Sequence, residues 1–483
     1  MIQDNESIAL GQEIERSHFR KQDFTDFGEL LRQETALLKE CFETQQFADQ
    51  PLMGGFELEM WLIDQACQPL PENEKFLELL NNDMVFAELA RFNIELNNTP
   101  KVLSGNALSK MHKQVQRTWD QCAKTAKKID GNVLAIGILP TLKEQHLSLD
   151  NMSSMKRYRA LNEQVRRMRE GHPLKLDIDG REALKTYHEN VMMESAATSF
   201  QLHLQVPQAL AAQMFNTAII ISAPMVAISA NSPYLFGHDL WDETRIPVFE
   251  QAVSVCLTDV CPDARVSFGN GYAKHSLMEC FTENLERYPV LLPESMDDDP
   301  ERFSHLRLHN GTIWRWNRPL VGFDEQGRPH LRIEHRIMAS GPSLIDTVAN
   351  AAFFYGLVQS LARQSPAPET VIHFSQARRN FYLAAQKGLD ARIRWTRGNE
   401  VCIHDLLLEE LLPLAHKGLE QLGIANSDIK KYLGVIEGRL RKKQNGANWQ
   451  RAFVKKNGKD MKTLTAAYLE NQKSNKPVFE WKL

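Results

Sequence analysis

The stretch Gly-Gly-Phe-Glu-Leu-Glu-Met-Trp-Leu, residues 54–62, decides the fold. Apolar residues alternate here with Glu57, Glu59 and Trp61, and a period of two predicts a β-strand whose side chains point to opposite faces. Glu57 and Glu59 therefore lie side by side on the face turned away from the core. Because like charges on one strand face repel each other, we expect either water to solvate this pair or a cation to lie between the carboxylates. For an isolated pair of glutamates, solvation by water is the simpler explanation. A cation site is indicated only if other segments bring matching side chains to the same face.

Three further segments show the same alternation, at residues 92–99, 199–206 and 331–337. Each places polar side chains on a single face: Glu95 in the first, Gln201, His203 and Gln205 in the second, Arg332, Glu334 and Arg336 in the third. If the four strands share one antiparallel sheet, one face carries four carboxylates, an imidazole and two guanidiniums. Such a face stays wet or holds cations, because the carboxylates repel each other.

The side-chain types select the cation and its use. Carboxylates with one imidazole suit Mg²⁺ or Mn²⁺, which also bind substrate phosphates, whereas zinc prefers Cys or several His ligands. Guanidinium groups beside such metals suit a phosphoryl group in transfer. The sequence contains no Walker A motif, and no Gly-x-Gly-x-x-Gly follows a predicted strand, which argues against a P-loop or a Rossmann site. The residues thus indicate metal-dependent phosphoryl transfer from a nucleotide on an open sheet.

Several short motifs, in this order, resemble the glutamate–cysteine ligase and carboxylate–amine ligase family of the glutamine synthetase-like superfamily. They are Gly-Phe-Glu-Leu-Glu (55–59), Ile-Glu-Leu-Asn (94–97), the His203 strand, Ser-Ala-Asn-Ser-Pro (229–233), Ile-Glu-His-Arg (333–336) and Gly-Ala-Asn-Trp-Gln-Arg (446–451). The resemblance implies an α+β fold with a curved antiparallel sheet, surrounding helices and a helical C-terminal region. It also implies that ATP and glutamate bind across the concave face.

The same resemblance implies roles for individual residues. The implied ligands of Mg²⁺ or Mn²⁺ are Glu57, Glu59, Glu95, His203 and Glu334. Arg336, and more weakly Arg332, would bind the phosphates of ATP and act with Glu59 in catalysis, while Gln201 and Gln205 would contact the nucleotide. The family often has a second histidine where this chain has Gln205, and a neutral amide there can still bond a nucleotide or substrate.

The implied reaction has two steps. ATP phosphorylates a substrate carboxylate, and an amine then attacks the acyl phosphate and releases phosphate. We expect glutamate as the carboxylate and cysteine or another amine as the acceptor, as in glutathione biosynthesis. The base that deprotonates the amine is not identified, and His238 and His275 are candidates on predicted loops.

Three alternatives stay open at this point. The first is a phosphagen-kinase-like phosphotransferase, although such enzymes hold the nucleotide mainly with arginines. The second is a family member that binds a metabolite or a partner without catalysis. The third is a structural ion-pair network in which Arg332 and Arg336 pair with Glu334 and Glu59.

The composition limits which binding partners and which cellular location we expect. A 43% hydrophobic and 24% charged chain is typical of a globular protein, and a net charge of −4 argues against a dedicated nucleic-acid binder. The seven cysteines are scattered, which favours reduced thiols and a cytoplasmic location. The N-terminus shows no secretory signal, and we interpret residues 209–230 as a buried core helix. We therefore expect small-molecule substrates without nucleic-acid or membrane partners, and homo-oligomerisation is left open.

The chain divides weakly into three predicted regions: an N-terminal helical segment (1–50), a catalytic region (51–365) and a mainly helical region (366–483). Helical periodicity covers residues 26–46, 104–130 and 343–363, and a short strand is predicted at 133–139. The helix at 155–169 is strongly basic. Its arginines favour a solvated face, and the alternative is that Arg157 or Arg159 faces an anionic ligand.

Overall fold

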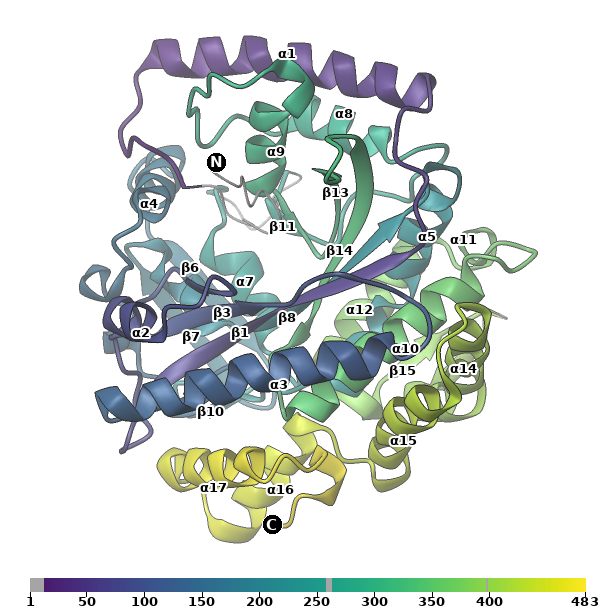
Figure 1. Cartoon of the computed structure of the whole chain (residues 1–483). Coiled ribbons are helices and arrows are strands. Elements are labelled where there is room, and N and C mark those ends of the chain that lie inside the picture. Colours follow the sequence, from purple (N-terminus) through teal and green to yellow (C-terminus); the bar gives the residue numbers. More distant parts are fainter. Residues whose placement is uncertain (1–12, 258–262, 397) are drawn as a thin grey trace.

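The computed structural model describes residues 13–257, 263–396 and 398–483, and a curved sheet lies at its centre (Figure 1). The sheet has eight strands, of which six follow the order β13-β14-β8-β1-β3-β2, while β4 and β5 also pair with β1. Every pairing in it is antiparallel. The strands are β1 (Met53–Asp64), β2 (Val85–Ala87), β3 (Asn93–Asn97), β4 (Lys101–Val102), β5 (Gly131–Leu134), β8 (Ser199–Val206), β13 (Asn317–Phe323) and β14 (Pro329–Ala339).

The four predicted alternating segments correspond to β1, β3, β8 and β14, and they do share one sheet. The register places Glu59 opposite Glu95, Glu57 opposite Gln201, and Glu334 opposite His203. Between residues 335 and 338 the register shifts, an irregularity of the kind that bends a strand. The predicted fold class, a curved antiparallel sheet with surrounding helices and a helical C-terminal region, is confirmed.

Helices cover both sides of the sheet (Figure 1). The helices α3 (Ala107–Ala126) and α10 (Leu344–Leu361) lie against the apolar face, while α9 (Ser304–Gly311), α8 (Met278–Arg287) and the outer α1 (Lys21–Glu43) lie beyond the polar face. The elements that complete the surroundings of the polar face are α4 (Lys156–Met168), the 3₁₀-helix η4 (Val191–Ala196) and α7 (Arg245–Ala252).

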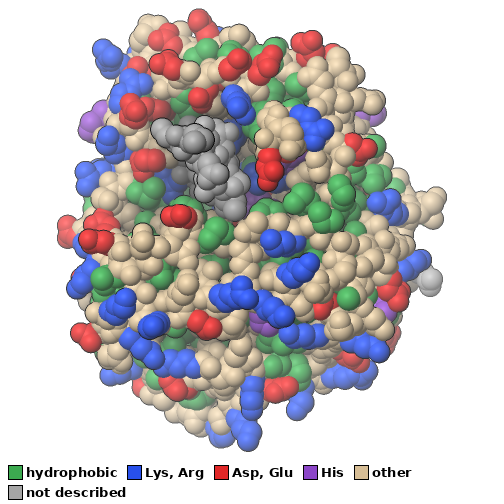
Figure 2. Space-filling view, in the orientation of Figure 1, with side chains coloured by type: hydrophobic (Ala, Val, Ile, Leu, Met, Phe, Trp, Pro, Cys, Tyr) green, Lys and Arg blue, Asp and Glu red, His purple; other side chains and the backbone are tan. Residues whose placement is uncertain are grey.

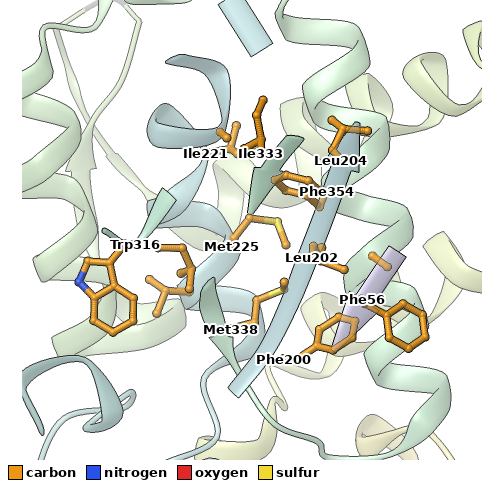
Figure 3. Packing of buried hydrophobic residues seen from close by; sticks show 14 of the residues in the cluster. Phe56, Phe200, Leu202, Leu204, Ile221, Met225, Trp316, Ile333, Met338 and Phe354 are labelled. Carbon is orange, nitrogen blue, oxygen red and sulfur yellow. The ribbon is translucent and has the colours of Figure 1, made fainter. Parts of the chain in front are cut away.

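The apolar face of the sheet is the main core. Leu202 and Leu204 of β8 and Ile333 of β14 pack against Met225 and Phe354 from the helices behind them (Figure 3). These side chains are at most 1% exposed. At about 25 cal/mol per Å² of apolar surface, such burial is the main stabilising contribution. The polar residues that alternate with them are thereby directed to the opposite face.

The long apolar helix predicted at 209–230 is interrupted. It forms α5 (Gln208–Ile220) and α6 (Ser222–Ser229), bent by 46° at the break. Pro224 lacks an amide hydrogen and its ring clashes with the carbonyl four residues earlier, which accounts for the bend. The predicted strand at 133–139 is likewise shorter than expected, because β5 ends at Leu134.

The helix α10 is long and apolar enough to cross a membrane, and so is the bent pair α5–α6 taken together. However, 94% of α10 is buried inside the protein. Both therefore serve as core helices, as expected for residues 209–230.

The C-terminal region packs directly on this core. It consists of α11 (Pro368–Val371), α12 (Phe374–Lys387), the hairpin β15 (Arg392–Arg394) and β16 (Glu400–Cys402), α13 (Ile403–Leu406), a π-helical turn (Leu407–Leu411), α14 (Leu412–Gln421), α15 (Asn426–Lys442), α16 (Gly446–Asn457) and α17 (Met461–Lys473). The backbones of α10 and α14 touch at Gly356 and Gly418, where a Cβ on Gly418 would lie 1.9 Å from the Gly356 oxygen. The three-region division of the chain stays a prediction.

Buried Asn231 joins two of the family-like motifs. Its side-chain nitrogen donates to the Ser340 carbonyl (2.7 Å) and the Tyr468 hydroxyl (2.8 Å), and its side-chain oxygen accepts from Gln450 (3.0 Å). Gly446 passes so close that a Cβ would lie 1.9 Å from this oxygen. The motifs at 229–233 and 446–451 therefore meet in a packing contact.

The remaining elements are α2 (Asn73–Leu80), the hairpin β6 (Leu174–Asp179) and β7 (Ala183–His188), and the short strands β9 (Tyr234–Leu235), β10 (His238–Asp239), β11 (Val266–Ser267) and β12 (Trp314–Arg315). Short 3₁₀ turns lie at Lys127–Ile129, Glu144–His146, Leu149–Asn151, Pro300–Arg302, Gly388–Asp390 and Val478–Glu480. Charged side chains of both signs are spread over the visible face (Figure 2), in keeping with the small net charge.

The cysteines differ in part from expectation. Cys41, Cys67, Cys122, Cys280 and Cys402 are free thiols, but Cys256 is disulfide-bonded. The prediction of uniformly reduced thiols is therefore wrong at Cys256.

Candidate active site

A cavity of about 1130 Å³ opens on the polar face of the sheet. Its floor is formed by β1, β3, β8, β13 and β14, and its walls come from α4, η4, α7 and α9. Every predicted site residue lines it: Glu57, Glu59, Glu95, Gln201, His203, Gln205, Arg332, Glu334 and Arg336.

Charge is ordered across this floor in the order of the strands. One edge, β13 and β14, carries Arg318, Arg332 and Arg336, with Glu334 between them. The central strand β8 contributes amides and the imidazole. On the other edge, β1 and β3, the charged cavity residues that the structure describes are all carboxylates: Glu57, Glu59 and Glu95. The cavity thus has a cationic edge and an anionic edge, separated by one strand.

A cluster formed by Glu57, His203 and Glu334 takes one residue from each edge and one from the strand between them. One ligand atom from each lies within 4.8 Å of the other two, and all three residues are buried. The His203 Nε2 is 2.6 Å from a Glu57 oxygen, and His203 Nδ1 has no hydrogen-bond partner among the residues that the structure describes. Two carboxylates and one imidazole at this spacing are the donor set that a hard divalent cation accepts. The cluster therefore fits Mg²⁺ or Mn²⁺ by its chemistry and spacing.

Glu334 is held by two arginines. Arg318 binds both of its oxygens, at 2.7 and 3.0 Å, and Arg336 donates to one of them at 3.2 Å. Burial by itself would raise the pKa of Glu334, but Arg318 and then Arg336 outweigh it and hold the pKa well below its usual range. Glu334 is therefore a permanent anion within the cluster.

Glu59 is oriented by its neighbours rather than by a cation. It accepts hydrogen bonds from the Ser199 amide (2.6 Å), the Ser199 hydroxyl (2.7 Å) and Gln201 Nε2 (2.8 Å). The Gln201 oxygen in turn accepts from Arg336. Burial and the charge of Glu88 raise the pKa of Glu59 to about 7. Gln201 therefore couples Glu59 to Arg336 through its amide.

Burial also raises the pKa of Glu95 and of Glu194. For Glu95 the neighbouring charges of Glu57 and Glu88 add to the effect, and its oxygen accepts from Asn97 (3.1 Å). Glu194 on η4 has a pKa of about 8, raised by burial and by Glu88. The carboxylates in this part of the cavity repel each other when they are ionised, and a bound cation would reduce that repulsion.

Arg332 lies opposite Gln205 in the β14–β8 register. Its Nε is buried and forms no hydrogen bond within the described part of the chain. Burial lowers the pKa of this guanidinium, which is nevertheless a permanent cation. A buried donor without a partner costs about 1–3 kcal/mol, so Arg332 is ready to receive an anionic ligand.

A family model for the glutamate–cysteine ligase family 2 (GCS2) matches residues 53–470. The chain belongs to this family. No curated protein matches the chain. Among solved structures it resembles a glutamate–cysteine ligase from Francisella tularensis in complex with AMP, at 10% identity and a TM-score of 0.59, over 89% of this chain and 90% of that one.

Two further matches have lower TM-scores. One is a bifunctional glutathione synthetase from Pasteurella multocida, at 11% identity and a TM-score of 0.47, covering 92% of this chain and 54% of that one. The other is a complex of the prokaryotic ubiquitin-like protein Pup with its ligase PafA, at 8% identity and a TM-score of 0.38, covering 89% and 73%.

The cavity also contains residues that the sequence patterns did not predict. Arg318 lies in β13, and Glu88, Tyr158 and Glu194 lie outside the sheet. Arg157 of the basic helix also lines the cavity, and whether it faces an anionic ligand stays a prediction. By contrast, Arg159 is exposed, and neither His238 nor His275 lines the cavity.

Proposed function

We propose that this protein is an ATP-dependent carboxylate–amine ligase that activates glutamate as an acyl phosphate and transfers the γ-glutamyl group to cysteine or another amine. The observation that supports the proposal most is the ordered charge of the cavity floor. The phosphates of ATP need cationic partners, and the ammonium group of an acceptor needs anionic ones. The strand order places a cationic edge and an anionic edge in one cavity.

The cationic edge would bind the phosphates of ATP. Arg332 has a buried Nε that no described residue bonds, and Arg336, further along β14 beyond Glu334, lines the same cavity. Guanidinium groups form paired hydrogen bonds with phosphate oxygens and stabilise charge that develops during transfer. Arg318 is bound to both oxygens of Glu334, so its role would be to position that carboxylate.

Glu57, His203 and Glu334 would hold Mg²⁺ or Mn²⁺, with Glu59 and Glu95 nearby on the same face. When bound, the metal would neutralise phosphate charge and orient the nucleotide. The cavity of about 1130 Å³ slightly exceeds the usual range for one small ligand, roughly 300–1,000 Å³, which suits two substrates bound together.

The reaction itself is the first test. Purified protein with Mg²⁺, ATP and glutamate is incubated with a panel of amines, and ADP and the amide product are measured together. We expect amine-dependent ADP release with at least one amine and one amide formed per ADP. ADP release that does not depend on any amine or carboxylate in the panel would contradict the proposal.

A variant pair tests the assigned residues. Glu57→Gln keeps the shape of the side chain but removes a charge at the cluster, so metal-dependent nucleotide binding should be lost. Glu325→Gln is the matched control, because Glu325 is an exposed carboxylate at the rim of the same cavity. Isothermal titration with Mg²⁺ and a non-hydrolysable ATP analogue should separate the two variants. Equal affinity in both would mean that Glu57 is not a ligand.

A further inference from the structure

Glu194 is presented to the cavity by a rigid support. The other members of η4 are all buried, and Glu194 is the one that lines the cavity. Asn190 precedes the helix, and its side-chain oxygen accepts a hydrogen bond from the Met192 amide (3.0 Å). The Val191 amide donates to the side chain of Asn162 on α4 (3.1 Å). These two hydrogen bonds hold the start of η4 in place and attach it to α4.

The carboxylate of Glu194 differs from its neighbours in its partners. Glu57, Glu59, Glu88, Glu95 and Glu334 each have a hydrogen-bond partner: His203, Ser199, Tyr158, Asn97 and Arg318, respectively. Over residues 13–257, 263–396 and 398–483, no side chain or amide hydrogen-bonds the Glu194 carboxylate, and no cation pairs with it within 4 Å. A half-buried carboxylate without a partner is free to act on a bound molecule.

The charges around Glu194 come from four elements. Glu88 follows β2 and Glu59 lies on β1, and both disfavour its ionised form, while Arg336 of β14 and Arg157 of α4 favour it more weakly. With burial as the largest cause, the pKa of Glu194 is raised to about 8. A general base works best when its pKa lies near the pH at which the enzyme operates. An ordinary glutamate, at about 4.3, is too weak for this task.

We propose that Glu194 is the general base that deprotonates the acceptor amine, an inference that rests on the ligase function proposed above. The ammonium group binds at the anionic edge and gives one proton to Glu194. Its nitrogen lone pair then attacks the acyl phosphate carbon, forming the C–N bond. The C–O bond to phosphate breaks, and its electron pair leaves with inorganic phosphate, which takes the second proton, while the third stays on the amide.

The test uses Glu194→Gln with two nucleophiles. Hydroxylamine is neutral near pH 7 and needs no base, whereas an amino-acid acceptor is mostly an ammonium ion. Losing a general base costs about 10²–10⁴-fold in rate, so we expect such a loss with the amino acid and less than threefold with hydroxylamine. The amino-acid rate of the variant should also rise with pH beyond the range in which that of the wild type levels off. Glu325→Gln, at the cavity rim, should match the wild type with both.

Three results would overturn the assignment. Equal losses with both nucleophiles would indicate a structural or metal-binding role, and so would a higher Mg²⁺ requirement in the hydroxylamine reaction. Full amino-acid turnover in Glu194→Gln would place the base elsewhere. Failure of the ligase function itself is a separate outcome, because the wild type would then yield no product with either nucleophile.

Discussion

Replacing Arg318 should destabilise the protein, because it leaves the buried carboxylate of Glu334 without its main partner. In Arg318→Met the bidentate contact to Glu334 is lost, and only the 3.2 Å bond from Arg336 is left among its arginine contacts. Glu334 is fully buried and Arg318 is 5% exposed. Removing one partner of a buried ion pair costs about 3–5 kcal/mol, because the remaining charge is left uncompensated. For 483 residues the unfolding entropy is about 1 kcal/mol per kelvin, so the melting temperature should fall by about 3–5 °C.

The pH dependence identifies the cause. In the wild type the pKa of Glu334 lies well below its unfolded value of 4.5, so its stabilising contribution is complete above pH 4.5 and is lost as the pH falls toward the folded pKa. Without Arg318 the carboxylate takes up a proton more easily. The difference between variant and wild type should therefore be largest at pH 7 and shrink below about pH 4.5.

Urea denaturation of the wild type, Arg318→Met and Arg318→Met/Glu334→Gln measures these differences. The double variant carries no buried charge at position 334 and should recover at least half of the loss. If Arg318→Met unfolds at the wild-type urea concentration at pH 7, or if the double variant is less stable than the single one, the pair is not the source of stability argued above.

Other parts of the molecule give further expectations. Gly418→Ala should lower stability by about 1–3 kcal/mol in urea, because its Cβ would overlap the Gly356 carbonyl, whereas Gly434→Ala in α15 meets open space and should raise stability by about 0.5–1 kcal/mol. The raised pKa values of Glu59 and Glu194, about 7 and 8, mean that the folded state binds more protons than the unfolded state. The free energy of unfolding of the metal-free protein should therefore fall as the pH rises from 5 to 9. In Glu194→Gln this dependence on pH should be weaker. Mg²⁺ should raise the melting temperature more at pH 8 than at pH 6, since it replaces those protons; an equal shift at both pH values would argue against binding by these carboxylates.

The sequence predicted the parts of the site that lie on regular strands. On β1, β3, β8 and β14 the alternation of apolar and polar residues fixes which side chains face the cavity, because the apolar set must be buried. Neighbouring strands then bring Glu57, His203 and Glu334 together even though they are far apart in the chain. For these residues, local patterning was sufficient.

Residues outside that pattern were not predicted for physical reasons. The strand β13 reads Asn-Arg-Pro-Leu-Val-Gly-Phe and is buried along almost its whole length, so Arg318 lacks the alternation that marks a polar face. Glu88 lies in the segment between β2 and β3 and Glu194 in a short 3₁₀-helix, where no periodicity links one residue to a face. Only the three-dimensional path of the chain brings these groups to the cavity.

The contact at Asn231 sets an order for the completion of folding during synthesis. Asn231 leaves the ribosome 219 residues before Gln450 and 237 residues before Tyr468, its two side-chain partners in the C-terminal helices. A buried amide that lacks its partners is costly, so the polypeptide behind the sheet cannot reach its final packing while those helices are still untranslated. The chain must therefore be synthesised as far as α17 before this part of the interior can pack, and α16 and α17 complete it.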